Sequence, residues 1–447
     1  MAGKQLSRRT FMAAASAGAM SVAYPAQTGM SGTISKDAAK PALLGGAPVR
    51  TKPFPGWPVW DPRAEESVLA ILRSGNWYRG QGETVTRFEK AYAELLGAKR
   101  ALCVVNGTNA LLTALHMLNV GVGDEVIVSP YTFIATYNVV LLSCALPVFA
   151  DTDPETMQID PDKIEERITE RTRAILPVHI LGQPANMDKI MAIARKHRLV
   201  VIEDACQAWL GEWRGHKVGT VGDLGCFSFQ NSKHLPCGEG GAVVGNDEDL
   251  MDRAMAFHNC GRAYGSMKAT SGYPIIGTNR RMTEYQAAIL LSQIQRLEAD
   301  TARRREHTAH LDSRLKDVPG ILPQKVYEGG RGVYHLYAFR VKSEAFGLSR
   351  GRFMEALRAE GIPCSGGYGP QYKDGLIDDA LNSKNFKRSF PAERLKSYKA
   401  ELVYPENDKL CTEAVWLTQN LLLGTKRDVD DIADAVIKIH ENRNKLA

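Results

Sequence analysis

The chain has 447 residues, of which 44% are hydrophobic and 24% are charged, a composition typical of a globular protein. A chain of this length exceeds the size at which one hydrophobic core stops growing, so we expect two unequal domains. The net charge of +6 does not indicate a nucleic-acid-binding face. The eight cysteines include no CxxC pair and no Cys/His spacing of the zinc type, so we expect neither a disulfide framework nor a metal site.

The N-terminus has the features of an export leader. The run SRRTFM at residues 7–12 precedes an Ala-rich segment, and no further charge occurs until Lys36. This pattern resembles a twin-arginine signal with a cleavage point after Ala26. We therefore expect a leader and linker over residues 1–36 and export by the twin-arginine route, with a cytoplasmic location as the alternative. The segment is too short and too rich in Ser, Gly and Pro for a membrane span, and we expect no span elsewhere.

From residue 100 onward, short apolar runs alternate with amphipathic segments. Strands are predicted at residues 101–105, 125–128, 146–150, 174–180 and 199–202, and helices at residues 109–118, 134–142, 161–168 and 187–197. This alternation is typical of an α/β fold, in which helices cover both faces of a parallel sheet. Two more strands, at residues 225–229 and 241–245, follow one another with no helix between them, which predicts a mixed, mostly parallel sheet.

The rhythm changes again near residue 283. A long polar helix is predicted from 283 to 316, followed by a second alternating region at residues 334–341, 350–360 and 429–442. We therefore expect an N-terminal arm and large domain over residues 37–300 and a smaller α+β domain over residues 301–447.

Ligands of open α/β sheets collect at the carboxyl ends of the strands, and three of these ends carry unusual residues. Asn106-Gly107-Thr108 opens a helix with free backbone N–H groups, which suits a phosphate, although a simple helix cap explains it equally well. Asp204 ends a buried strand, where it could also be a cap or a metal ligand. Phe133 follows the strand at 125–128, and an aromatic side chain there either fills the core or stacks on a flat ring.

Lys233 lies in the stretch FSFQNSKHLPCGEGG, between two buried-looking strands. A lysine whose side chain is exposed to solvent is more typically found on the exposed face of a helix. Together, a phosphate cradle, a carboxylate, a stacking surface and a shielded amine match pyridoxal 5′-phosphate. In this interpretation Lys233 bonds to the cofactor aldehyde, and Asp204 keeps the ring nitrogen protonated so that the ring accepts electrons. Partial desolvation would favour the neutral, nucleophilic amine of Lys233.

Seven runs of the sequence, by their order and spacing, carry a resemblance to a known family: VVNGTNALLTAL, GVGDEVIVSPYTFIAT, PVHILGQPANMD, VVIEDACQAW, FSFQNSKHLPCGEGG, HNCGR and TNRRMTEYQAAIL. Over residues 42–439 the chain resembles the DegT/DnrJ/StrS sugar aminotransferases, which have fold type I of the pyridoxal-phosphate enzymes. The resemblance implies a seven-stranded sheet in the large domain. The early runs LLGGAPVRTKPFPGWPVWD and NWYRGQG resemble the subgroup that aminates cyclitol ketones and ketosugars.

The resemblance also implies a role for each matching residue. Lys233 would be the cofactor lysine, Asp204 the partner of the ring nitrogen, and Gln207 a contact on the ring-hydroxyl side. Phe133 would stack on the ring. The phosphate would be held by Gly107, Thr108 and Ser228, with Asn279 reaching it from the neighbouring subunit of a homodimer. A helix cap is the alternative role for Asn279.

The predicted activity is transfer of an amino group from an amino acid, glutamate or glutamine, to a ketosugar or cyclitol ketone. Some relatives that dehydrate sugars have His in place of the lysine, so the presence of Lys233 favours transamination. A sugar dehydratase and a non-catalytic regulator with this fold are the alternatives. A dinucleotide-binding dehydrogenase is disfavoured, because GEGGAVVG lies between two strands and not between a strand and a helix.

Overall fold

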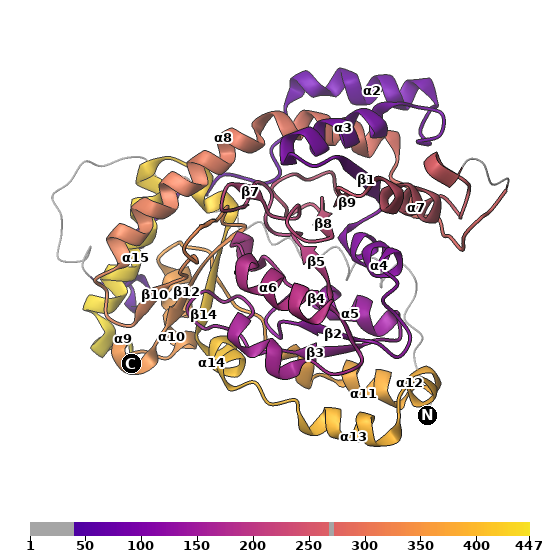
Figure 1. Cartoon of the computed structure of the whole chain (residues 1–447). Coiled ribbons are helices and arrows are strands. Elements are labelled where there is room, and N and C mark those ends of the chain that lie inside the picture. Colours follow the sequence, from indigo (N-terminus) through magenta and orange to yellow (C-terminus); the bar gives the residue numbers. More distant parts are fainter. Residues whose placement is uncertain (1–39, 268–271) are drawn as a thin grey trace, which may run out of the picture.

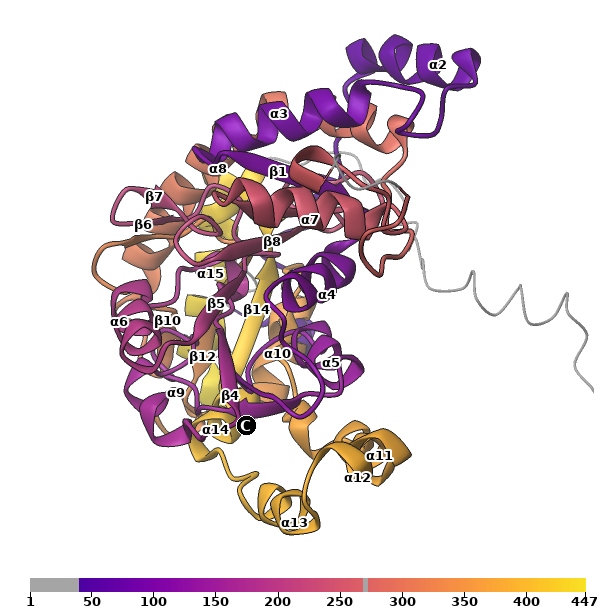
Figure 2. The ribbon, with the colours of Figure 1, turned by 45° about the vertical axis from the view of Figure 1, so that its right-hand side comes forward.

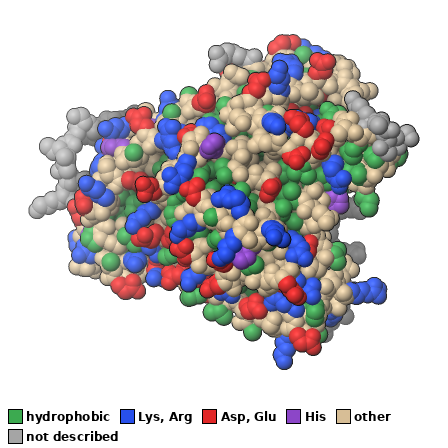
Figure 3. Space-filling view, in the orientation of Figure 1, with side chains coloured by type: hydrophobic (Ala, Val, Ile, Leu, Met, Phe, Trp, Pro, Cys, Tyr) green, Lys and Arg blue, Asp and Glu red, His purple; other side chains and the backbone are tan. Residues whose placement is uncertain are grey.

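The computed structural model describes residues 40–267 and 272–447 (Figure 1). The predicted leader, residues 1–36, lies outside the described residues. Among the helices of the described ranges, none is both long and apolar enough to cross a membrane. All eight cysteines are free thiols. Figure 3 shows acidic and basic side chains interspersed over the face that it presents.

A seven-stranded sheet of order β1-β9-β8-β5-β4-β2-β3 forms the centre of the molecule (Figure 1). Its strands are β1 (Arg100–Val104), β2 (Glu125–Val128), β3 (Leu146–Phe149), β4 (Thr172–Leu176), β5 (Val200–Asp204), β8 (Leu224–Ser228) and β9 (Gly241–Gly245). Neighbours from β8 through β3 pair in parallel, whereas β9 is antiparallel to both β1 and β8. The predicted mixed, mostly parallel seven-stranded sheet is confirmed.

Helices cover both faces of this sheet, as the near-continuous apolar strands require. One face packs against α4 (Gly107–Met117), α5 (Ala135–Leu142) and α7 (Glu248–His258). The other packs against α3 (Thr84–Leu96), α6 (Met187–His197) and the first half of α8 (Glu284–Leu315). Side chains of β1 alternate between the two layers, with Leu102 in the first core and Cys103 in the second.

Two predicted elements differ from the structure. Residues 161–168 form two 3-10 turns, η3 (Pro161–Lys163) and η4 (Glu165–Arg167), where the sequence predicts a helix. This segment buries Pro161 and Ile164, whose spacing of three fits the three residues per turn of a 3-10 helix, and Ile168 is already extended. The strand predicted at 174–180 ends at Leu176, because Pro177 has no N–H for the ladder. The turn η5 (Ile180–Gly182) follows.

The C-terminal part contains a second sheet of order β10-β12-β14-β13, with all its pairs antiparallel. Its strands are β10 (Ile321–Pro323), β12 (Leu336–Val341), β13 (Ser365–Gly366) and β14 (Ala414–Thr418). Helices α10 (Arg350–Ala359) and α15 (Lys426–Glu441) share a core with it. The boundary predicted at residue 300 falls within α8, which runs along both parts (Figure 1). The division into two domains stays a prediction.

Three short helices, α11 (Gly375–Asn382), α12 (Lys384–Ser389) and α13 (Ala392–Ala400), form a group at one end of the molecule (Figure 2). They pack into the same core as β3, and Tyr398 donates a hydrogen bond of 2.6 Å to the carbonyl of Pro147.

The remaining elements are α2 (Glu65–Ser74), α9 (Ser343–Phe346), α14 (Pro405–Glu413), α16 (Arg443–Leu446), the 3-10 turns η1 (Ala42–Leu44), η2 (Pro62–Ala64), η6 (Gly265–Met267), η7 (Gln371–Lys373) and η8 (Gln419–Leu423), and a small sheet of β6 (Glu212–Trp213), β7 (His216–Lys217) and β11 (Gly330–Arg331).

Candidate active site

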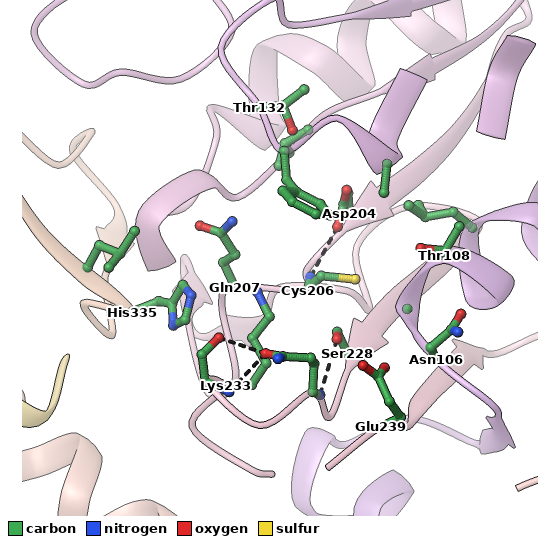
Figure 4. A pocket seen from close by; sticks show the side chains of 18 of the residues that line it. Asn106, Thr108, Thr132, Asp204, Cys206, Gln207, Ser228, Lys233, Glu239 and His335 are labelled. Atoms are coloured by element: carbon green, nitrogen blue, oxygen red, sulfur yellow. Dashed lines mark hydrogen bonds between the residues drawn. The ribbon is translucent and has the colours of Figure 1, made fainter. Parts of the chain in front are cut away.

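One cavity of about 600 Å³ lies where the carboxyl ends of several central strands meet (Figure 4). It collects every predicted site residue except one: Gly107, Thr108, Phe133, Asp204, Gln207, Ser228 and Lys233. These residues come from four separate stretches of the sequence. Strand order brings them together, because β5 and β8 are neighbours and β9 lies between β8 and β1.

Lys233 is held in the loop that joins β8 to β9. The loop is closed by backbone hydrogen bonds from Asn231 N to Gly238 O (2.9 Å) and from Lys233 N to Gln230 O (2.9 Å). Within the described residues, Lys233 Nζ has neither a hydrogen-bond partner nor an ion-pair partner, and it lies 5.9 Å from the centre of the Trp209 ring. Burial lowers the pKa of the Lys233 ammonium, partly offset by Cys206 and Asp204. Burial therefore shifts the equilibrium of Lys233 toward the neutral amine, which is the form that acts as a nucleophile or base.

Asp204 is a buried carboxylate at the end of β5, with 4% of its surface exposed. Its Oδ2 accepts a hydrogen bond of 2.8 Å from Thr136 Oγ1, and its Oδ1 accepts one of 3.1 Å from Cys206 N. Thr132 Oγ1 lies 2.8 Å from Thr136 Oγ1. Because the Thr136 hydroxyl donates to Asp204, the Thr132 hydroxyl donates to Thr136. This chain of donors orients the carboxylate.

Replacing Thr136 by valine should lower the free energy of unfolding by about 1.5–3 kcal/mol, since it removes a hydrogen bond to a buried charged group. Thr308→Val is the matched control, because Thr308 is also a fully buried threonine but its hydroxyl has no hydrogen-bond partner among the described residues. Denaturant unfolding of the two variants measures the difference. If the two variants have equal free energies of unfolding, the hydrogen bond from Thr136 to Asp204 does not stabilise the protein.

The start of α4 forms an anion-binding end of the cavity. Asn106 caps the helix by accepting a hydrogen bond of 2.9 Å from Asn109 N, so the predicted cap is present. The first amides of the helix, those of Gly107 and Thr108, have no intrahelical acceptor and point their partial positive charge outward. A Cβ at Gly107 would approach Ser228 Cβ to 2.8 Å. Glycine therefore lets the backbone and Ser228 share a close cradle, which fits the phosphate of the predicted cofactor.

Gln207 links the cavity to a residue that the sequence analysis missed. Its Oε1 accepts a hydrogen bond of 2.8 Å from Leu181 N, and its Nε2 donates one of 3.2 Å to Tyr368 Oη. Burial raises the pKa of Tyr368 to about 12, so its phenol stays protonated. Tyr368 and His335 both line the cavity. They come from the C-terminal part, and the glycines around Tyr368 in GGYGP were the available sequence signal.

Phe133 and Asn279 are exposed, unlike the other predicted site residues. Phe133 lines the cavity but leaves 54% of its surface exposed. Asn279 is exposed and does not line the cavity; it pairs with Asn259 in an isolated antiparallel bridge. The alternative role of Asn279 as a helix cap is wrong, because Thr283 forms the capping box of α8 with Gln286.

Comparisons with known proteins agree with this geometry. The DegT/DnrJ/EryC1/StrS aminotransferase family matches residues 60–436. A protein of Streptoalloteichus tenebrarius, provisionally named L-glutamine:3-amino-2,3-dideoxy-scyllo-inosose aminotransferase, is 39% identical over 414 residues, 91% of this chain and 99% of that protein. The L-glutamine:2-deoxy-scyllo-inosose aminotransferase of Streptomyces kanamyceticus is 36% identical over 421 residues, which cover 91% of this chain and 98% of that protein.

Solved structures give the same result. The crystal structure of 3-amino-5-hydroxybenzoic acid synthase has a TM-score of 0.76 and 31% identity, and the match covers 87% of this chain and all of that chain. An aminotransferase from Psychrobacter cryohalolentis also has a TM-score of 0.76, with 30% identity over 88% of this chain and 100% of that one. The chain therefore belongs to the DegT/DnrJ/EryC1/StrS aminotransferase family and is a pyridoxal-phosphate-dependent aminotransferase, as its motifs predict.

Proposed function

We propose that the enzyme moves the amino group of L-glutamine to the ketone of a cyclitol of the inosose type. The names of its relatives support this donor and this acceptor class. The observation that carries the proposal is the single cavity in which the free amine of Lys233 and the carboxylate of Asp204 lie beside the cradle at the start of α4.

In this proposal, each residue of the cavity has a separate role. When bound, pyridoxal phosphate supplies a ring that accepts electrons and an aldehyde that carries the amino group. Gly107, Thr108 and Ser228 would hold its phosphate, and Asp204 would keep its ring nitrogen protonated. Lys233 Nζ would hold the cofactor between reactions and move the proton at the substrate carbon. Tyr368, through Gln207, would orient the ring-hydroxyl side.

A half-reaction assay tests the donor. The purified holoenzyme is mixed with L-glutamine, L-glutamate or L-alanine without acceptor, and the absorbance of the bound cofactor is followed. We expect L-glutamine to convert the cofactor fastest. The converted enzyme is then offered 2-deoxy-scyllo-inosose or a nucleotide 4-ketosugar. Amination of the nucleotide sugar alone would contradict the cyclitol proposal and leave the aminotransferase class intact.

We also propose that the enzyme is a homodimer that completes each cavity with Asn279 of the other subunit. The support is the exposure of four apolar side chains, Trp77 and Tyr78 in one segment and Tyr273 and Ile276 in the segment that leads to Asn279. Residues 77–78 are held against the segment that leads into α8: Glu284 N donates to Trp77 O at 3.0 Å, and the Arg281 guanidinium lies 5.1 Å from the centre of the Tyr78 ring. Exposed aromatic side chains held next to the segment that contains Asn279 are typical of an interface.

Mixing Lys233→Ala with Asn279→Ala should restore activity if the sites are shared. A mixed dimer then has one cavity with both defects and one with neither, so equal mixing restores roughly a quarter of the wild-type sites. Activity is measured after subunit exchange has been confirmed by mass spectrometry of tagged chains. The control is the double variant Lys233→Ala/Asn279→Ala, taken through the same subunit-exchange procedure alone. Confirmed exchange without recovery would show that both residues serve the same cavity of one chain.

Finally, we propose that the chain is exported by the twin-arginine route, because Arg8 and Arg9 directly precede an uncharged Ala-rich segment. Fractionation of cells that express the full chain, beside the Arg8→Lys/Arg9→Lys variant, tests this. We expect the wild type outside the cytoplasm and the variant inside. Retention of both in the cytoplasm would contradict export.

A further inference from the structure

The N-terminal arm, residues 41–61, ties the C-terminal helices to the loop that carries Lys233. Near the middle of the arm, Arg50 Nη1 forms ion pairs with Asp428 (2.6 Å) and Asp431 (2.8 Å) of α15. The Arg50 guanidinium also lies 3.8 Å from the centre of the Phe54 ring. The side chain of Arg50 is almost fully buried, so this part of the arm is fixed and not a loose tail.

Further along, the arm is fastened on both sides of Trp57. Asn420 Nδ2 donates a hydrogen bond of 2.7 Å to Pro55 O, and Gln293 Nε2 donates one of 2.9 Å to Val59 O. These anchors lie two residues before and two residues after Trp57. Between them, two arginines of α8 lie close to the indole: Arg296 and Arg304, whose guanidinium carbons are 5.6 and 5.5 Å from the ring centre. Cation–π contacts of this kind hold the ring in one orientation.

In that orientation, Trp57 Nε1 donates a hydrogen bond of 3.0 Å to the main-chain carbonyl of Lys233. No other donor of the described residues reaches this carbonyl. The amide of Lys233 is bound within its own loop, to Gln230 O. Both backbone groups of Lys233 are therefore fixed, one by the loop and the other by a residue 176 positions earlier in the chain.

We propose that Trp57 is a positioning residue for Lys233, which holds the main chain of the lysine so that its amine stays aimed into the cavity. The inference rests on the proposed role of Lys233 as the cofactor lysine. Trp57 does not itself line the cavity, so it acts only through the lysine. A positioned amine competes with free amines for the cofactor aldehyde by its high effective concentration, which falls when the loop is less restrained.

Trp57→Phe is the variant that isolates this hydrogen bond, because phenylalanine keeps a flat ring near the two arginines and removes the N–H. Trp60→Phe, a change in the same arm at an exposed tryptophan, is the matched control. Gln293→Ala provides a second variant, since it removes the anchor at Val59 and leaves Trp57 in place.

The measurement is amine exchange in the holoenzymes. Methylamine nitrogen replaces Lys233 nitrogen on the cofactor aldehyde carbon, and the lysine leaves as a free amine, so no redox partner is needed. Absorbance gives the methylamine concentration at half exchange. In Trp57→Phe we expect this concentration to fall about five- to tenfold, the equivalent of one hydrogen bond. In Gln293→Ala we expect a smaller fall, and in Trp60→Phe none. The melting temperatures of Trp57→Phe and Trp60→Phe should agree.

Three results would overturn the inference. If Trp57→Phe is folded and exchanges like the wild type, Trp57 does not position the lysine. If Trp57→Phe and Trp60→Phe lower the methylamine concentration at half exchange equally, the cause is a general change in the arm and not the loss of this hydrogen bond. If borohydride labels the wild type at a residue other than Lys233, the proposed role of Lys233 fails, and the positioning role fails with it.

Discussion

Replacing Lys233 by alanine should lower the rate of transamination by roughly 10³-fold or more, since the substitution removes both the covalent anchor and the proton-transfer group. The cavity and the phosphate cradle should remain, because Lys233 Nζ has no hydrogen-bond or ion-pair partner among the described residues that its loss could leave unpaired. Steady-state kinetics with saturating cofactor measures the effect.

Lys90→Ala is the control for this prediction, because Lys90 is a surface lysine with 79% of its side chain exposed. We expect it to retain full activity. A small primary amine added to Lys233→Ala should restore part of the rate by accepting the proton in place of the side chain. Wild-type turnover by Lys233→Ala would show that another group does this chemistry.

Asp204→Asn should keep the fold and lose activity by about 10³-fold, because it removes a preorganised buried charge. The amide can still accept a hydrogen bond from Cys206 N with its oxygen, and its nitrogen can donate to Thr136 Oγ1. The neutral side chain cannot keep the ring nitrogen protonated. The measurements are turnover, cofactor affinity and melting temperature.

Asp312→Asn is the control for Asp204→Asn. Asp312 is a partly buried carboxylate that accepts a hydrogen bond of 2.7 Å from Tyr337 Oη, and it does not line the cavity. We expect it to change stability and leave turnover unaffected. If Asp204→Asn turns over like the wild type, Asp204 has only a structural role.

The central sheet can be predicted because its strands are buried on both faces and therefore appear as short, continuous apolar runs. The absence of a predicted helix between residues 229 and 241 correctly indicates that β8 and β9 are joined by a loop, and that loop carries Lys233. Once parallel order is expected, the polar residues at the carboxyl ends must share one edge. Hence the amino-acid sequence is sufficient to assign Gly107 and Asp204 to one site.

Features that depend on distant contacts cannot be predicted in this way. Tyr368 and His335 reach the cavity from the C-terminal part. The glycines of GGYGP mark the segment of Tyr368 as unusual, but they do not indicate the direction in which either side chain points. Trp57 meets Lys233 across 176 positions, so the contact depends on how the arm is anchored. The apolar residues of segment 161–168 fit a spacing of three as well as four, and only packing distinguishes the 3-10 turns from the predicted helix.

Borohydride reduction of the holoenzyme, followed by peptide mapping, shows whether Lys233 carries the cofactor. Reduction makes the bond between the lysine and the cofactor permanent, so mass spectrometry identifies the residue that carries it. We expect a single pyridoxyl phosphate label on Lys233. A label on any other lysine, or no label in cofactor-saturated protein, would contradict it.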